Sequence, residues 1–186
     1  TFTPNKDFTG TPVPATVQAK DANGTPTTAT YSPTVKPVTP KGVDTFTKDI
    51  QGATQKGTPE FKPGKATIDG KEVEVPIDTK EPAKLIDPKT GQPVDSVTID
   101  GEGTYTVDPE TGEVTFKPDP QFTGKGTPIK VQRKDTNGTP VTADYTAVVV
   151  PADPDGDHVA TADIQGAEQS GTPQFHGGKA RIGNEE

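Results

Sequence analysis

The sequence repeats itself at a constant offset of 114 residues, and this period restricts the folds that the chain can adopt. Residues 1–72 align with residues 115–186 without a gap, and about half of the aligned positions are identical. The longest matches are KDANGTPTTATY with KDTNGTPVTADY, from Lys20 and Lys134, and DIQGATQKGTPEF with DIQGAEQSGTPQF, from Asp49 and Asp163. A solenoid turn has only ~20–50 residues, whereas ~100–150 residues is the usual size of an independent domain. The period therefore predicts domain-sized units in tandem.

Two proline-spaced segments mark the seams between the units. They are YSPTVKPVTPKG, with Pro33, Pro37 and Pro40, and VVVPADPDGD, with Pro151 and Pro154. Proline stiffens a linker and stops sheet pairing across it. We therefore predict a complete repeat domain at residues 41–151, preceded by the C-terminal part of one repeat (1–40) and followed by the N-terminal part of the next (155–186). We expect the chain to be an internal piece of a longer protein.

The composition predicts a thin core. Pro and Gly supply 21 and 20 residues, the net charge is −8, and large aliphatic residues are few. Such a chain buries little apolar surface to offset the entropy lost on ordering. We expect marginally stable domains, with some disordered stretches between them.

The pattern of apolar residues favours strands and turns. Apolar and polar residues alternate on both sides of Asp69-Gly70, around DPETGE (residues 108–113) and around Asn137-Gly138, which is typical of β-hairpins. Only EPAKLIDP (81–88) suggests a short helical turn. We predict an all-β fold of tandem β-sandwich-like domains, with a core made of Phe61, Ile68, Val73, Val75, Ile77, Val97, Ile99, Tyr105, Val107, Val114, Phe116, Phe122, Ile129, Val131, Tyr145 and Val149.

Several kinds of chemistry are disfavoured by the residues present. The sequence has no Cys, no cluster of Lys and Arg for nucleic acid, and no apolar run of the ~20 residues that would insert into a membrane. Its two histidines, His158 and His176, correspond to Asp44 and Lys62 one repeat earlier, so the units share no histidine-based device. We therefore expect no enzyme activity, no catalytic residue and no cofactor.

Three alternating carboxylates form the one candidate metal site. Asp153, Asp155 and Asp157 in ADPDGDH have the spacing of oxygen ligands in a calcium loop. The bidentate Glu that such a loop places at its twelfth position is replaced by Ile164, and the preceding seam has no acidic cluster. The pattern favours a solvated acidic linker over a calcium site.

The repeat resembles a known family. The segments DIQGATQKGTPEF, GEGTYTVDPETGEVTFKPDPQFTGKGTP and KDTNGTPVTADYTAVVVP are similar to the CshA-type fibril repeat of streptococcal cell-wall-anchored surface adhesins. The resemblance implies an extracellular protein, anchored to the cell wall through a region outside this chain. Its repeats would form an elongated stalk that projects an adhesive region, with roles in cell adhesion, biofilm and virulence.

The resemblance also implies which partners to expect. Each repeat would contact its neighbours in the same chain, and host or bacterial surface molecules would be bound by other regions of the parent protein. An alternative stays open, in which the repeats themselves bind host protein, glycan or neighbouring cells in a biofilm.

Overall fold

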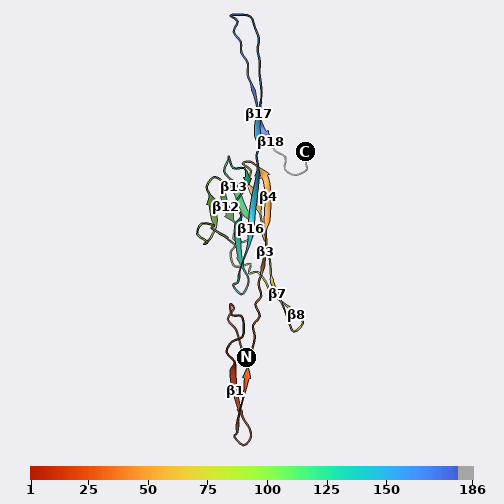
Figure 1. The fold of residues 1–186 in the computed structure, drawn as a ribbon, viewed down its shortest axis with the longest axis vertical. Helices are drawn as coiled ribbons and strands as arrows, with labels where there is room; N and C mark the ends of the chain where they lie inside the picture. Colours follow the sequence, from red (N-terminus) through yellow and green to blue (C-terminus); the bar gives the residue numbers. More distant parts are fainter. Residues whose placement is uncertain (180–186) are drawn as a thin grey trace.

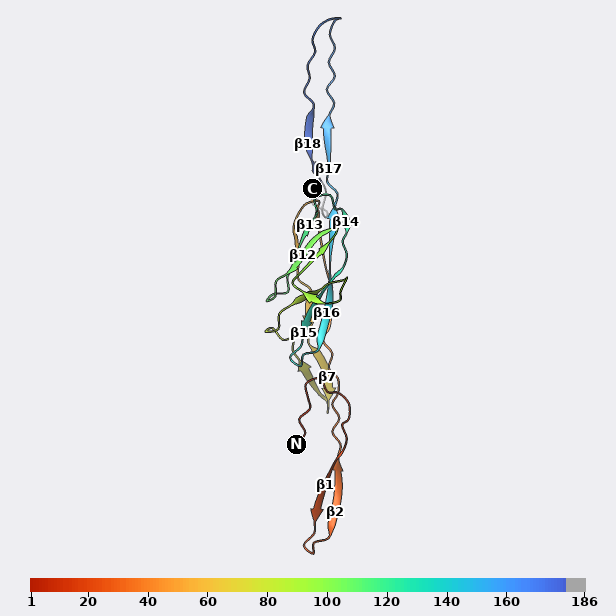
Figure 2. The same cartoon turned by 90° about the vertical axis from the view of Figure 1, so that its left-hand side faces the viewer.

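The computed structural model describes residues 1–179, and every regular element in this range is a β-strand. A central pair of sheets lies between two hairpins that extend from its opposite ends, so that the molecule is long and narrow (Figures 1 and 2). Residues 180–186, which end the predicted third segment, lie outside the described range. Among the described residues, no helix is long and apolar enough to cross a membrane.

The larger sheet is built around β16, a strand of 11 residues. Its order is β10-β9-β15-β16-β14, with antiparallel neighbours throughout, and β4 pairs with β16 in parallel. Its members are β4 (Thr45–Ile50), β9 (Lys84–Ile86), β10 (Pro93–Val94), β14 (Gly124–Lys125), β15 (Ile129–Lys134) and β16 (Pro140–Val150).

The smaller sheet covers one face of the larger sheet. Its order is β11-β12-β13-β5, all antiparallel, and its members are β5 (Gln55–Gly57), β11 (Ser96–Ile99), β12 (Gly103–Val107) and β13 (Val114–Pro118). The β12–β13 turn is held by Asp108, whose Oδ1 accepts the backbone N–H groups of Glu110 and Thr111, both at 2.9 Å. These two hydrogen bonds lower the pKa of the Asp108 carboxyl. The predicted all-β sandwich fold is confirmed.

Three aromatic rings fill the centre of the sandwich. Tyr105 stacks on Phe116 at a centroid distance of 4.3 Å, and Tyr145 from the other sheet meets Tyr105 edge-on at 6.3 Å. The predicted core is confirmed for these rings and for Val97, Val107, Val114, Ile129, Val131 and Val149, all buried, while Phe61, Ile99 and Phe122 pack against it partly buried.

The prediction was wrong for the hairpin around Asp69-Gly70. The turn forms, with φ angles of 50° and 76°, between β7 (Gly64–Ile68) and β8 (Lys71–Val75). Within residues 1–179 these strands pair only with each other, so Ile68 and Val73 remain 39% and 42% exposed. Val75 and Ile77 are half-buried. Alternation gave this hairpin an apolar face, but no second sheet in the described part of the chain covers that face.

The helical turn expected at residues 81–88 was also wrong. This segment contains β9, which pairs with β15, and its Leu85 is fully buried. A three-residue strand is too short to show an alternating pattern. Buried alanines were not predicted either, because a single methyl group adds little to an apolar pattern. The buried residues absent from the predicted core are Ala83, Leu85, Val141, Ala143 and Ala147.

The flanking segments reproduce parts of the central unit in structure as well as in sequence. The hairpin β1 (Ala15–Lys20) and β2 (Pro26–Tyr31) has the register of β15 with the first half of β16. The hairpin β17 (Asp153–Asp157) and β18 (Gln174–Lys179) has the register of β3 (Lys41–Val43) with β6 (Glu60–Lys62). The 114-residue period is therefore a structural period, set by local sequence.

Candidate functional site: the joint between consecutive repeats

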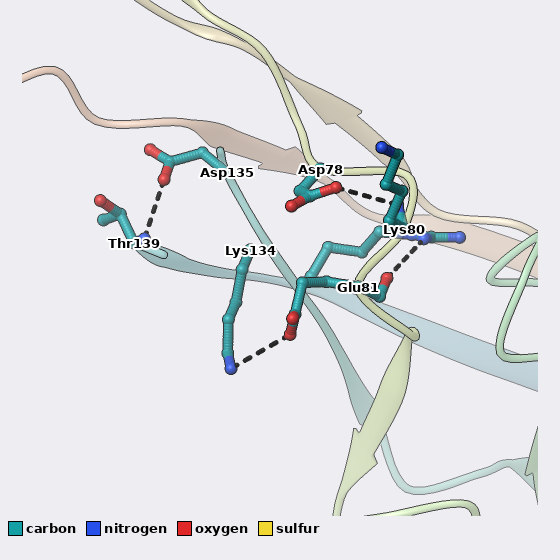
Figure 3. A network of polar contacts seen from close by, with 7 residues as sticks. Asp78, Lys80, Glu81, Lys134, Asp135 and Thr139 are labelled. Carbon is teal, nitrogen blue, oxygen red and sulfur yellow. Dashed lines mark hydrogen bonds and ion pairs between the residues drawn. The ribbon is translucent and has the colours of Figure 1, made fainter. Parts of the chain in front are cut away.

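The β15–β16 turn forms one side of a joint between the two consecutive repeats. We call residues 135–139 the tip. The Asp135 Oδ1 atom accepts the backbone N–H group of Thr139 at 2.8 Å (Figure 3). It also accepts the N–H group of Asn137 at 2.9 Å, and Gly138 has a φ of 85°. The corresponding Asp21 makes the same two bonds in the preceding repeat. Because Gly tolerates positive φ and the Asp side chain bonds to backbone groups two and four residues ahead, the turn forms from its own sequence.

The other side of the joint comes from the end of the preceding repeat. We call residues 4–9 the end loop. The Lys6 Nζ atom donates to the Thr136 carbonyl oxygen at 3.3 Å. A hollow between the two repeats is lined on one side by the end loop with Val35 and Val38, and on the other by Asn137 and Thr139. The tip of one repeat thus lies against the end loop of the repeat before it.

Charge is complementary across this contact. Lys6 from one repeat and Asp135 from the next line a common hollow. Asp135 is only 1% exposed, whereas Asp21 is exposed. The tip is held from its other side by the segment before β9, since Thr136 N–H donates to Pro76 O at 3.0 Å and Asp78 N–H donates to Lys134 O at 2.9 Å.

The linker between the repeats is packed rather than free. Pro40 is buried, and residues 38–39 lie against Gly64 at the start of β7. A Cβ atom on Gly64 would lie 2.7 Å from Val38 Cγ1 and 2.8 Å from the Thr39 carbonyl carbon. One repeat later, a Cβ atom on Gly178 would overlap the Ala152 carbonyl in the same way. Both repeats therefore use a glycine to let the linker approach the sheet.

The central unit presents an end loop of its own at its far end. Phe122 N–H donates to Asp119 O at 2.9 Å, as Phe8 N–H donates to Asn5 O at 3.1 Å. Phe122 meets Phe116 edge-on at 6.2 Å, as Phe8 meets Phe2 at 6.3 Å. Lys6 corresponds to Pro120, so its ammonium contact is particular to one joint. A repeat thus carries a tip at one end and an end loop at the other.

Substitution of Gly64 by Ala is expected to destabilise the chain by about 1–3 kcal/mol, because the added methyl group would overlap the linker. The matched control is Gly177→Ala, where a Cβ atom would have no atom of residues 1–179 within 4 Å. That change is expected to stay within about 0.5 kcal/mol. Urea unfolding of both variants checks the difference, and equal midpoints would contradict a tightly packed linker.

The three predicted calcium ligands lie along β17. All three line one hollow, together with His176 and Lys179 from the facing strand. Asp157 Oδ2 lies 3.1 Å from His176 Nε2. Among residues 1–179, no group of three or more Asp, Glu, His or Cys side chains is placed to hold a metal ion.

The joint was not predicted from the sequence. Its parts were visible as repeated motifs, the Asn-Gly-Thr turn and the glycine of GKATI and GKARI. Each has a local explanation, a turn or a strand start, so neither indicates a contact between repeats. The one signal that could have suggested such a contact is that the Asn-Gly-Thr turn precedes, and the glycine follows, each linker at the same distance in both repeats.

Comparison with protein families identifies the repeat. The model of the surface adhesin CshA repetitive domain matches residues 1–35 and 37–149. The chain belongs to this family. Membership confirms the resemblance found in the sequence and makes the chain a repeat region of an extracellular surface adhesin, for which an adhesion role rather than a catalytic one is expected.

Other comparisons add little about this CshA repeat region. No curated protein matches the sequence. Among solved structures, it is similar to the N-terminal eight immunoglobulin domains of Down syndrome cell adhesion molecule, isoform 1.30.30. That match has 14% sequence identity and a TM-score of 0.38, and it covers 90% of this chain and 26% of the other.

Proposed function

We propose that this CshA repeat region is a non-catalytic spacer in an elongated stalk, anchored to the cell wall outside this chain and carrying an adhesive region away from the cell. The observation that carries the proposal is the joint, in which the tip of one repeat lies against the end loop of the repeat before it. Tip and end loop occupy opposite ends of the central unit, so adding repeats adds length.

Two further observations support a spacer. The net charge of −8 makes neighbouring stalks repel one another. In addition, the exposed aromatic side chain of the central unit, Phe46, is replaced by Ala160 in the following repeat. A ligand surface shared by all repeats would be expected to keep such a residue.

Small-angle X-ray scattering of proteins with two, three and four tandem copies tests the proposal. Because β16 has 11 residues and a strand rises about 3.3 Å per residue, each added copy is expected to lengthen the maximum dimension by at least about 36 Å. A maximum dimension that grows more slowly than this would mean that the repeats fold back on one another, and the stalk proposal would be wrong.

The competing function is a binding module for host protein, glycan or neighbouring cells. Purified repeat-only protein would then be retained by immobilised matrix proteins or glycans, and by cells that carry the same repeats. Retention that is lost when the repeats are unfolded in urea would favour this alternative. The stalk proposal predicts no retention above that of an unrelated acidic β-sandwich.

A further inference from the structure

The first and last long strands of the central unit are neighbours and run in the same direction. β4 pairs in parallel with β16 over six residue pairs, from Thr45 with Tyr145 to Ile50 with Val150. The chain enters the sandwich at one end, before β4, and leaves it at the opposite end, after β16 (Figures 1 and 2). Apart from the three-residue strand β3, which pairs with β6, the two strands that receive a pull along the chain are therefore bonded directly to each other.

The direction of the pull decides how this ladder is loaded. Tension draws β4 toward the preceding repeat and β16 toward the following one, so the two strands must slide past each other lengthwise. Sliding strains all rungs of the ladder at the same time. Opening the same ladder from one end would break its rungs one after another, which requires a smaller force.

Hydrogen bonds continue the ladder beyond both ends of the six pairs. Asp144 N–H donates to Asp44 Oδ1 at 2.8 Å where the pairing begins. Gln51 N–H donates to Val150 O at 2.8 Å where it ends. These bonds also identify the residues of β16 that face β4, since the backbone groups of alternate residues point to opposite edges of a strand. They are residues 144, 146, 148 and 150.

Buried side chains bridge the same two strands. The Thr47 hydroxyl from β4 lies 2.8 Å from the Tyr145 hydroxyl of β16 and donates to Gln55 Oε1 at 2.7 Å. Gln55 Nε2 then donates to Val148 O at 3.0 Å. Gln55 and Tyr145 are both buried, so water is kept from these bonds. Sliding β4 along β16 would break them together with the ladder.

We infer that the β4–β16 pair is a mechanical clamp that bears the tension applied to each repeat. The inference rests on the proposed stalk function, because only a stalk transmits force from an adhesive region to the cell wall. It goes beyond length, since it assigns resistance to force to one pair of strands and to the Thr47–Gln55–Tyr145 bridge.

The other repeats in the chain retain the parts of this clamp. The following repeat has Thr161 and Gln169 at the positions of Thr47 and Gln55, and the Thr161 hydroxyl donates to Gln169 Oε1 at 2.6 Å. The preceding repeat has Tyr31 at the position of Tyr145.

A proline in the preceding repeat fits the same scheme. Pro33 corresponds to Ala147, whose carbonyl accepts the N–H of Gly126 beside β14. The backbone groups of residue 147 therefore face away from β4. The missing N–H of Pro33 removes no rung from the side on which β4 pairs.

Single-molecule pulling on the whole chain tests the clamp. The handles are attached to introduced cysteines, and because the sequence contains no native Cys, they react only at the chosen positions. In the first variant, Lys41→Cys and Pro151→Cys place the handles at opposite ends of the sandwich, so that β4 and β16 slide. In the second, Lys41→Cys and Asn137→Cys place both handles at one end, so that the strands are peeled apart. Lys41, Asn137 and Pro151 are exposed.

The sliding geometry is expected to require a several-fold higher unfolding force than the peeling geometry, although both variants should have the same urea midpoint. Equal forces in the two geometries would overturn the clamp. That result would not contradict the stalk proposal, because the scattering test measures length and does not depend on force. A failed scattering test would contradict the stalk proposal, and the ratio of unfolding forces would still decide whether the β4–β16 pair resists tension.

A pair of threonine variants tests the side-chain bridge. Thr47→Val, in the sliding geometry, is expected to lower the unfolding force, because it removes the hydroxyl shared by Tyr145 and Gln55. Thr98→Val removes an exposed hydroxyl that bonds to Thr104 at 3.1 Å and should leave the force unchanged. An unchanged force in Thr47→Val would limit the clamp to the backbone ladder and contradict the role assigned to the bridge.

Discussion

Replacing Phe116 by Ala is expected to lower the free energy of unfolding of the central repeat by about 3–5 kcal/mol, the usual cost of truncating a buried aromatic residue. Phe116 is fully buried, stacks on Tyr105 and supports Phe122. A small domain has only ~5–15 kcal/mol of stability in total, and this core is thin. We therefore expect much of the variant to be unfolded at physiological temperature, which near-ultraviolet circular dichroism with urea titration would detect.

The same repeat offers a matched control. Phe46, on β4, is 66% exposed, and Phe46→Ala removes the same atoms from a site that is already in contact with water. Its effect should stay within about 0.5 kcal/mol. Comparable losses for Phe116→Ala and Phe46→Ala would mean that the two sheets do not enclose the core described here.

Features that depend on neighbouring residues could be predicted from the sequence, whereas features that depend on distant residues could not. Turns were predictable because their chemistry is local, as at Asp69-Gly70 and at Gly138, where positive φ restricts the choice of residues. The burial of Tyr105 and Phe116 was predictable because alternation on two strands joined by a short turn places both rings on one face.

Burial that depends on a second sheet was not predictable in the same way. Val73 alternates with charged residues as regularly as Val107 alternates with threonines, yet Val73 is exposed and Val107 is buried. The difference lies in whether another sheet covers the strand, and that is decided by residues far away in the sequence. The joint was missed for the same reason, since Lys6 and Thr136 are 130 residues apart.

The flanking repeats separate the features that local sequence determines from those that need the complete sandwich. The turn bonds of Asp21 match those of Asp135. The Thr161–Gln169 hydrogen bond likewise matches that of Thr47 with Gln55. Tyr31 and Phe175 in these flanking repeats are nevertheless exposed. Local sequence therefore specifies the hairpins in every copy, while burial of Tyr145 and partial burial of Phe61 require the complete sandwich. Stability is thus expected to belong to the whole repeat, and a repeat should unfold cooperatively.

High pH is expected to weaken this core, because two of its three central rings are tyrosines. Burial raises the pKa of Tyr105, and the nearby carboxylate of Glu102, which accepts the Tyr105 hydroxyl at 3.2 Å, raises it further. Burial also raises the pKa of Tyr145, against the opposing effect of its hydrogen bond with Thr47. Each ring therefore keeps its proton in the folded state at a pH where the unfolded chain, with a tyrosine pKa of about 10, loses it.

A raised pKa in the folded state fixes the sign of the effect. The stability contributed by the neutral tyrosines is fully present below about pH 10 and is lost as the pH rises further, because ionisation then favours the unfolded chain. Urea midpoints between neutral pH and about pH 12 should fall in the wild-type chain. They should fall less in Tyr105→Phe, which keeps the ring and removes the ionising group. If both proteins lost stability equally, the alkaline transition would have to come from groups other than Tyr105, and the raised pKa of Tyr105 would not be what weakens the core at high pH.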